Sequence, residues 1–279
     1  MKKLILTGAA GALGSTLRAP LAAMCDELVS TDLVENIENL APNETYIKAD
    51  VGSLDAMVDI SKGADMFVHF GAIADEDIWD NILHSNIIGA YNVWEAAYRN
   101  GLKRVVYASS VHAVGMHAKT GTIGVDAPHK PDTYYGLAKC FAEDLASLYW
   151  DKRGVEAVCM RIFSATPKPM NARAIGTWLS PDDLIQLVEK SVSSPVVGNS
   201  IIYGISNNDR AVVDNAQAGH IGYRPKDNAE DYAKEIFATT PPLDNKDPAN
   251  LMIGGPFATV ELGNSGVAGI KAMTAGEDE

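Results

Sequence analysis

A run of glycines between a short apolar segment and a helical pattern, at the start of the chain, most constrains the fold. Residues 3–7 are typical of a buried strand, and apolar residues then recur at helical spacing up to residue 21. Glycines in such a turn let a pyrophosphate approach the helix N-terminus. The alternative is a glycine-rich turn without a ligand. We predict a dinucleotide site whose first contacts are Gly8, Gly11, Ala12, Leu13 and Gly14.

Short apolar runs and longer helical patterns alternate over the first half of the chain. This order predicts an α/β fold with a Rossmann-like doubly wound parallel sheet. We expect residues 1–163 to form the core that binds the dinucleotide. Residues 164–279 should form a small substrate-binding lobe and a tail, packed on the core, with a short helix over 181–189 and a short strand over 201–205. The expected strands are 3–7, 27–31, 46–48, 64–70, 104–108 and 155–162, and the expected long helices are 85–99 and 133–151.

Polar or glycine residues follow several of these strands, where ligands bind in open α/β sheets. Asp32 ends the second strand, and a carboxylate there would bond the ribose hydroxyls and repel a 2′-phosphate. We therefore predict NAD rather than NADP as the cofactor. Asp50 is a candidate for contacting the adenine, or else a simple turn residue. The predicted cofactor site also includes Leu33, Val51, Gly71 and Ala72.

Tyr135 and Lys139 lie four residues apart in the second long helix, and so on one face of it. A nearby cation lowers the pKa of a phenol, so the pair can supply a general base. Ser110 ends the fifth strand and would hold the oxygen that Tyr135 deprotonates, although it could merely bond its own turn. Asn86 would anchor a water leading to Lys139, or cap backbone groups.

Composition excludes several classes of protein. The formal net charge is -13, which disfavours a nucleic acid partner. The three cysteines suit reduced thiols better than disulfides, and the six histidines show no metal-ligand spacing, so we expect no metal. The apolar run at the N-terminus is too short for an export signal, and no run is long enough to span a membrane. We expect a cytoplasmic protein.

In combination, Thr7-Gly-Ala-Ala-Gly-Ala-Leu-Gly14, Asn86-x-x-Gly89, Ser110 and Tyr135-x-x-x-Lys139 resemble the extended short-chain dehydrogenase/reductase superfamily. Within it the chain resembles the bacterial uronate dehydrogenases, through stretches such as His69-Phe-Gly-Ala and Arg161-Ile-Phe-Ser164.

This resemblance implies NAD-dependent oxidation at C1 of a cyclic hexuronate, such as glucuronate or galacturonate, to an aldarolactone. Tyr135 would be the general base, and Arg173 would pair with the sugar carboxylate. The remaining substrate contacts that it implies are Ser110, Val111, His112 and Ser164. By analogy with the superfamily we also expect a homo-oligomer.

Two positions depart from the family pattern. The family has Ser-Asn-His where this chain has Ser110-Val111-His112, and it has a serine at the position of Ala74. Asp75, Glu76 and Asp77 add negative charge beside Ala74, which would disfavour an anionic ligand if they faced the site. An aldose 1-dehydrogenase, a nucleotide-sugar epimerase or reductase, and a non-enzymatic NAD-binding regulator therefore remain as alternatives.

Overall fold

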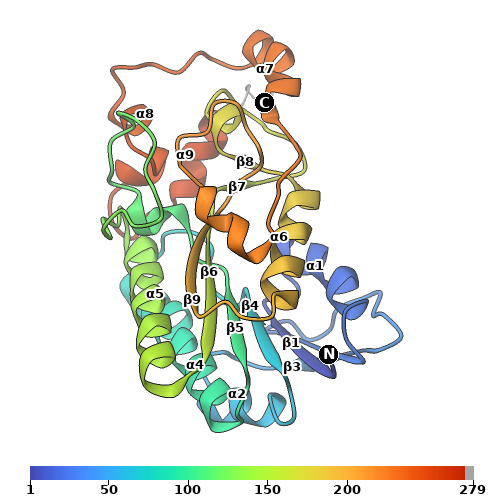
Figure 1. Ribbon diagram of the computed structural model, residues 1–279. Helices are drawn as coiled ribbons and strands as arrows, with labels where there is room; N and C mark the ends of the chain where they lie inside the picture. Colours follow the sequence, from blue (N-terminus) through green and yellow to red (C-terminus); the bar gives the residue numbers. More distant parts are fainter. Residues whose placement is uncertain (274–279) are drawn as a thin grey trace.

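A parallel sheet of seven strands forms the centre of the computed structural model, which describes residues 1–273 (Figure 1). The strand order is β3-β2-β1-β4-β5-β6-β9, and every neighbouring pair is parallel. This confirms the predicted fold class. The strands are β1 (Lys3–Thr7), β2 (Glu27–Asp32), β3 (Glu44–Lys48), β4 (Met66–His69), β5 (Arg104–Tyr107), β6 (Glu156–Ile162) and β9 (Asn199–Gly204).

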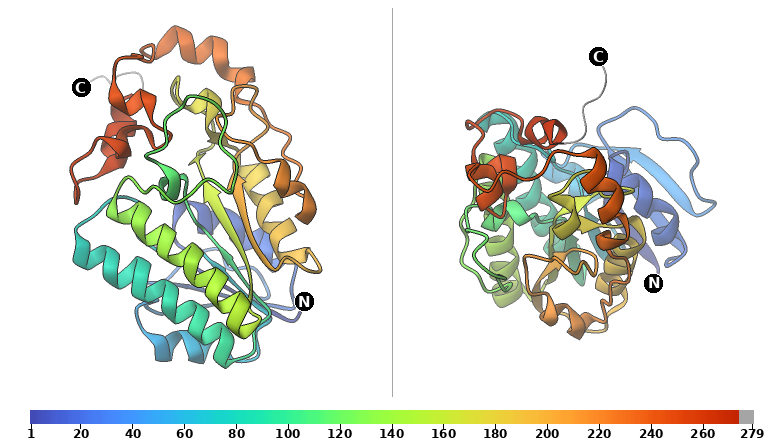
Figure 2. Two further views of the ribbon diagram at one scale, coloured as in Figure 1. Left: turned by 60° about the vertical axis from the view of Figure 1, so that its left-hand side comes forward. Right: turned by 90° about the horizontal axis from the view of Figure 1, so that it is seen from above.

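Helices cover both faces of the sheet because side chains alternate along each strand. Leu4 and Leu6 of β1 pack on one side with α1 (Ala12–Ala22) and α6 (Pro181–Ser193). Ile5 points the other way, into a core formed with three further helices. These helices are α2 (Leu54–Ile60), α4 (Gly89–Arg99) and α5 (Tyr134–Arg153), and Figure 2 shows the two layers.

The helix that carries Tyr135 and Lys139 begins and ends close to the predicted residues. The Thr133 side chain caps α5 by accepting a hydrogen bond from the backbone of Gly136 at 3.0 Å. Gly154 ends the helix in the left-handed conformation, with φ of 69°. The cap therefore fixes the height of Tyr135 and Lys139 above the sheet.

The other long helix begins earlier than the predicted residue 85. It comprises α3 (Trp79–Ile82), a π-helical segment (Leu83–Ile88) and α4. Ile82 is fully buried, which extends the apolar face one turn towards the N-terminus. π-Helical turns frequently mark functional sites, and this segment contains Asn86.

The expected boundary at residue 163 divides the sheet itself. β9 and α6 come after it, yet β9 pairs with β6 and α6 packs into the same core as α1. The predicted strand 201–205 and helix 181–189 are thus parts of the core, because their buried faces complete it. The remaining elements of this region are β7 (Ser164–Ala165), β8 (Trp178–Leu179), α7 (Ala233–Thr239), α8 (Pro248–Leu251) and α9 (Gly266–Ala272).

Short 3-10 helices span Val111–Val114, Ala174–Gly176, Ala216–Ile221, Ala229–Tyr232 and Gly255–Ala258. The end of the predicted tail, residues 274–279, lies outside the described residues. None of the described helices is both long and apolar enough to cross a membrane.

The strand order reverses between β1 and β4. Connections from β1 lead to β2 and β3 on one side, whereas β4 leads to β5 and β6 on the other. The loops that follow β1 and β4 therefore separate at the carboxyl edge of the sheet and leave a crevice.

Candidate active site

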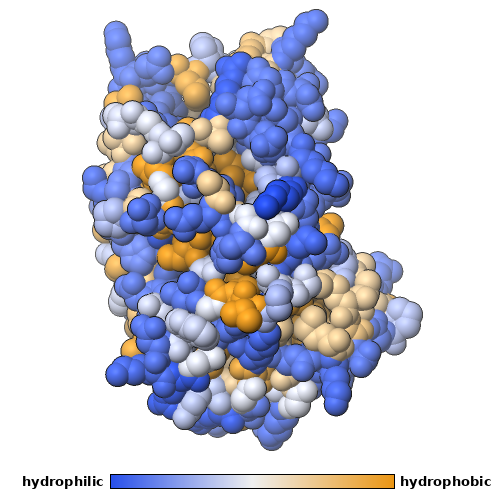
Figure 3. Space-filling view, viewed as in Figure 1, coloured by the Kyte–Doolittle hydropathy of each residue, from blue (hydrophilic) through white to orange (hydrophobic). Residues whose placement is uncertain are grey.

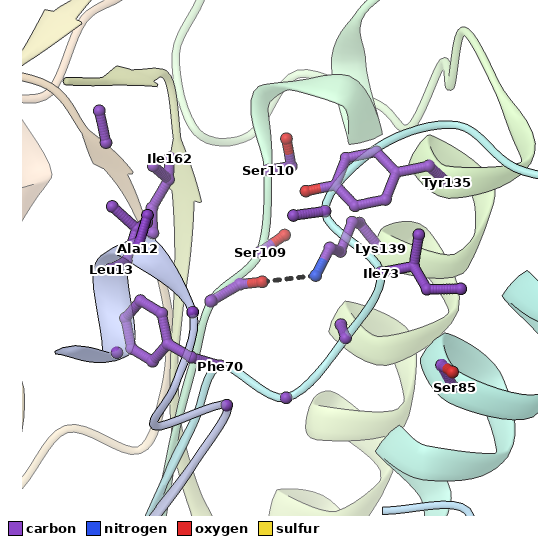
Figure 4. A pocket seen from close by; sticks show the side chains of 18 of the residues that line it. Ala12, Leu13, Phe70, Ile73, Ser85, Ser109, Ser110, Tyr135, Lys139 and Ile162 are labelled. Carbon is purple, nitrogen blue, oxygen red and sulfur yellow. Dashed lines mark hydrogen bonds between the residues drawn. The ribbon is translucent and has the colours of Figure 1, made fainter. Parts of the chain in front are cut away.

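A cavity of about 800 Å³ occupies this crevice and contains nearly every residue predicted from the sequence (Figure 4). Its walls come from the ends of β1, β2, β4 and β5, from α5 and from the region after residue 163. Asn86 is the one predicted site residue that does not line it. The predicted residues in its walls are Gly8, Gly11, Ala12, Leu13, Gly14, Asp32, Leu33, Asp50, Val51, Gly71, Ala72, Ser110, Val111, His112, Tyr135, Lys139, Ser164 and Arg173.

The glycine turn brings the backbone close to the start of α1. Gly8 has φ of +74°, and a Cβ on Gly14 would lie 2.0 Å from the Gly8 carbonyl oxygen. The first turn of α1 has no side-chain cap and no acidic residue. Its free N–H groups and the positive end of the helix dipole can therefore bind a pyrophosphate, which fits a dinucleotide at this end of the cavity.

Two carboxylates, Asp32 and Asp50, lie in the cavity wall at the ends of β2 and β3. Asp32 accepts hydrogen bonds from the backbone N–H groups of Ala10 at 2.9 Å and Leu33 at 2.7 Å. Asp50 accepts one from Gly52 and lies 2.9 Å from Nε2 of His84. Burial raises the pKa of Asp50, but its hydrogen bonds outweigh this effect and the net pKa is lowered. These hydrogen bonds hold both side chains in place, with oxygens that can accept from ribose hydroxyls or an adenine amine.

Tyr135, Lys139 and Ser110 meet in the middle of the cavity. The Lys139 ammonium donates a hydrogen bond to the Ala108 carbonyl at 2.7 Å and lies 5.1 Å from the centre of the Tyr135 ring. Ser110 caps a 3-10 helix, since its hydroxyl accepts from the backbone of His112 at 3.3 Å. Figure 4 shows the Ser110 and Tyr135 side chains side by side above Lys139.

Burial, rather than the neighbouring ammonium, dominates the electrostatics of this group. It raises the pKa of Tyr135 to about 12, against a smaller lowering effect of the Ser110 hydrogen bond. It also lowers the pKa of Lys139 to about 7. The expectation that Lys139 would bring the Tyr135 pKa down is therefore not met by the protein alone, because both groups are desolvated.

Asn86 acts on the backbone. Its side-chain oxygen accepts from the Ile73 N–H and its amide nitrogen donates to the Ile73 carbonyl, both at 2.9 Å. Of the two roles considered for it, capping backbone groups is the one that the geometry supports. Ile73 itself lines the cavity, so Asn86 positions the loop after β4 against the catalytic residues.

Arg173 is a buried cation without a carboxylate partner among residues 1–273. Its guanidinium donates to the Ser164 hydroxyl at 3.2 Å and to the Ile253 carbonyl at 3.0 Å, while Nε has no hydrogen-bond partner. Burial lowers its pKa to about 10, although Asp132 partly offsets this. A buried cation that lines a cavity and lacks an ionic partner favours an anionic ligand.

His112 is held between a carboxylate and an aromatic ring. Its Nδ1 lies 2.7 Å from the buried carboxylate of Asp132, and its ring stacks on Phe257 at 3.8 Å. An ionised carboxylate only accepts hydrogen bonds, so Nδ1 carries the proton and Nε2 is left for a ligand.

The end of the described chain forms a cavity wall that the sequence analysis did not predict. Phe257, Val267 and Ile270 line the cavity and pack around Tyr135. They come from a segment rich in glycine and proline, with no motif that points to a site. Asp75 and Glu76 do not line the cavity. Their carboxylates instead accept hydrogen bonds from backbone N–H groups of this segment, so their charge does not face the site.

Comparisons with known proteins agree with this geometry. A family described as the NAD dependent epimerase/dehydratase family matches residues 4–176. A uronate dehydrogenase of Pseudomonas putida is 41% identical over 92% of this chain and 95% of that protein. One of Agrobacterium fabrum is 42% identical over 92% of this chain and 97% of that protein.

A solved structure extends the comparison to three dimensions. It is a mutant uronate dehydrogenase of Agrobacterium tumefaciens complexed with NAD. It has a TM-score of 0.90 and 41% identity, covering 94% of this chain and 98% of that one.

Proposed function

The chain belongs to the NAD dependent epimerase/dehydratase family and, within it, to the uronate dehydrogenases, and from this premise we propose the reaction and the role of each residue. The reaction is NAD-dependent oxidation of a cyclic hexuronate at C1 to the aldarolactone. The observation that carries the substrate class is Arg173, buried in the cavity wall and lacking an ionic partner among residues 1–273.

Tyr135 is the general base. Its phenolate takes the proton of the C1 hydroxyl and becomes the phenol, the C1–H bond breaks, and the C1 oxygen becomes the lactone carbonyl. Bound NAD supplies the hydride acceptor and, in its oxidised form, a positive charge near the phenol. Such a charge favours the phenolate and offsets the burial that otherwise raises the pKa of Tyr135. The Ser110 hydroxyl, beside the phenol, orients the reacting oxygen.

Lys139 holds its place through the Ala108 carbonyl, which leaves further ammonium protons for a cofactor ribose. The apolar surroundings of Tyr135, made by residues such as Ile82, Ala138 and Phe257, exclude water from the reacting atoms. Exclusion of water strengthens each electrostatic contact in the site.

Arg173 binds the sugar carboxylate. A planar guanidinium can meet a carboxylate with two parallel hydrogen bonds, and Arg173 lines the cavity in which the sugar would bind. The Ser164 hydroxyl accepts a hydrogen bond from the same guanidinium and contacts a hydroxyl of the sugar ring. His112, with Nε2 free, contacts a second hydroxyl. Oxidation of a neutral aldose would leave the buried cation uncompensated.

We also propose a homo-oligomer that forms through the outer faces of α4 and α5. Tyr91, Tyr98, Leu148 and Trp150 expose 37–52% of their surface there. Light scattering after gel filtration would test this assembly.

A cytoplasmic location remains our proposal, which the three unpaired cysteines support.

The reaction is tested by following NADH absorbance with four sugars: glucuronate, galacturonate, glucose and galactose. We expect turnover with at least one uronate and a much lower kcat/KM with both neutral sugars. Faster oxidation of the neutral sugars would replace the proposal with an aldose 1-dehydrogenase.

A further inference from the structure

The end of the chain forms one wall of the cavity and is tied down by two adjacent carboxylates. Residues 255–272, which we call the C-terminal lid, include a 3-10 helix, α9 and the loop between them. Phe257, Val267 and Ile270 of the lid pack with Tyr135 and Ile73 in one apolar cluster. Figure 2 shows this red segment near the first turn of α5, at the carboxyl end of the sheet.

Asp75 binds the lid at the start of α9. One carboxylate oxygen accepts from the backbone N–H groups of Gly266 at 2.9 Å and Val267 at 3.1 Å. The other oxygen accepts from the Ser265 hydroxyl. These contacts span about 190 residues of sequence, so they fix the lid to the loop that follows β4.

Glu76 makes a contact of a different kind. Its side chain is buried, one oxygen accepts from the Gly263 N–H at 2.9 Å, and the other accepts from the N–H of Tyr135 itself at 2.8 Å. That N–H belongs to the first turn of α5, where no helix carbonyl can accept it. A carboxylate is also favoured there by the helix dipole. One buried carboxylate therefore joins the lid to the backbone of the proposed catalytic base.

We propose that Glu76 is a positioning residue that couples closure of the C-terminal lid to the placement of Tyr135. With the lid closed, the carboxylate holds the first turn of α5 and the Gly263 loop at once, and the apolar lid residues shield the reacting carbon from water. With the lid open, the carboxylate loses one partner and the first turn of α5 loosens. The lid thereby makes the base competent only when the site is covered. This inference rests on the proposed function.

Glu76→Gln tests the coupling because glutamine keeps one acceptor oxygen and replaces the other with a donor. Asp77→Asn is the matched control, since it removes the same charge from the adjacent carboxylate, whose hydrogen bonds within residues 1–273 go to Ile78 and Asn81. We expect Glu76→Gln to lower kcat for the uronate by at least about tenfold. The Kd of NADH should change by less than about threefold, because the glycine turn and Asp32 are untouched. Asp77→Asn should leave both constants near those of the unaltered enzyme.

Gly263→Ala disturbs the hydrogen bond between Gly263 and Glu76 from the side of the lid. Gly263 has φ of +87°, which alanine rarely adopts, and it lies away from the core. We expect it to lower kcat in the same direction. The double variant Glu76→Gln/Gly263→Ala should lose little more than Glu76→Gln alone, because both changes break one link. If the fold-decrease in kcat of the double variant equals the product of the two single decreases, the two effects are independent and the coupling is overturned.

Hydrogen–deuterium exchange tests the lid without any turnover. In Glu76→Gln, backbone exchange should rise both in residues 255–272 and in the first turn of α5, and it should rise in neither for Asp77→Asn. Unchanged exchange in both segments, or a rise in the lid alone, would contradict the coupling. Absence of uronate oxidation in the unaltered enzyme would refute the proposed function instead, and the exchange result would still stand.

Discussion

Lys139 places its ammonium nitrogen 5.1 Å from the ring centre of Tyr135, and both side chains are more than nine-tenths buried. Desolvation therefore dominates both groups: it raises the pKa of Tyr135 to about 12 and lowers that of Lys139 to about 7. In the proposed mechanism, the positive charge of the oxidised cofactor lowers the pKa of Tyr135 and so restores a usable base. This arrangement has a direct consequence for the pH dependence of turnover.

We expect kcat to rise with pH between about pH 6 and pH 9, because the reactive phenolate is the minor form below its pKa and its fraction grows with each pH unit. Initial rates at saturating NAD and uronate measure this. Tyr135→Phe should lower kcat by about 10²–10⁴-fold while NADH still binds. A kcat that falls over this range would show that Tyr135 does not act as the base.

Asp32 should set the choice between NAD and NADP. Its carboxylate is fixed by two backbone N–H groups in the cavity wall. We expect Asp32→Ala to raise the KM for NAD by about tenfold, since a hydrogen bond to a charged group contributes about 1.5–3 kcal/mol. The preference for NAD over NADP should narrow at the same time. The control is Glu35→Gln, an exposed carboxylate outside the cavity lining, and equal effects of the two changes would contradict this role.

Val111 and Ala74 line the cavity where the family pattern has polar side chains. We expect Val111→Asn and Ala74→Ser each to lower the KM for the preferred uronate by about two- to tenfold, the range that one added hydrogen bond of about 0.5–1.5 kcal/mol allows. Steady-state kinetics with glucuronate and galacturonate also show which epimer gains. An unchanged KM in both variants would mean that neither position faces the sugar.

Glu143 holds a buried ionic network one turn after Lys139. It accepts from Arg161 at 2.8 Å, from His129 at 2.7 Å and from Ser109 at 2.5 Å. Burial raises the pKa of Glu143, but hydrogen bonds from His129 and Arg161 outweigh it and the net pKa is lowered. Its stabilising contribution is therefore present above the unfolded pKa of about 4.3 and lost as the pH falls through the lower folded value.

We expect Glu143→Gln to lower the free energy of unfolding by about 3–5 kcal/mol at neutral pH, since it leaves Arg161 buried without its charge partner. Urea denaturation measures this loss, which should shrink in acid. Asp144→Asn is the control, because that neighbouring carboxylate is 78% exposed and should change stability by less than about 1 kcal/mol. Similar losses in both variants would rule out the network as the cause.

The sequence predicted most of the core and most of the cavity for a physical reason. In a parallel sheet the residue after each buried strand must lie at one edge, so Asp32, Asp50, Gly71 and Ser110 were brought together by strand order alone. The glycine spacing and the Tyr135–Lys139 pair are local signals, readable without tertiary contacts. Their roles at the site remain to be tested by the variants above.

Other features depend on contacts that no local pattern encodes. The strand β9 was expected but was not assigned to the sheet, since the sequence of a short apolar run does not indicate which strand it pairs with. The lid residue Phe257 meets His112 through tertiary contacts of the lid, among them the bonds of Asp75 and Glu76 to backbone groups about 190 residues away. The pKa of Tyr135 was misjudged because burial, which a sequence does not specify, outweighs the nearby charge.

The most direct test of the account compares glucuronate and glucose as substrates of the unaltered enzyme and of Arg173→Met. Thermal unfolding of both proteins controls for the lost contacts with Ser164 and Ile253. We expect kcat/KM for glucuronate to fall by at least about 10²-fold, because truncating one partner of a buried charge pair costs about 2–5 kcal/mol. The value for glucose should change little, so the preference for the uronate should collapse. A retained preference for glucuronate in Arg173→Met would contradict the assignment of this guanidinium to the sugar carboxylate.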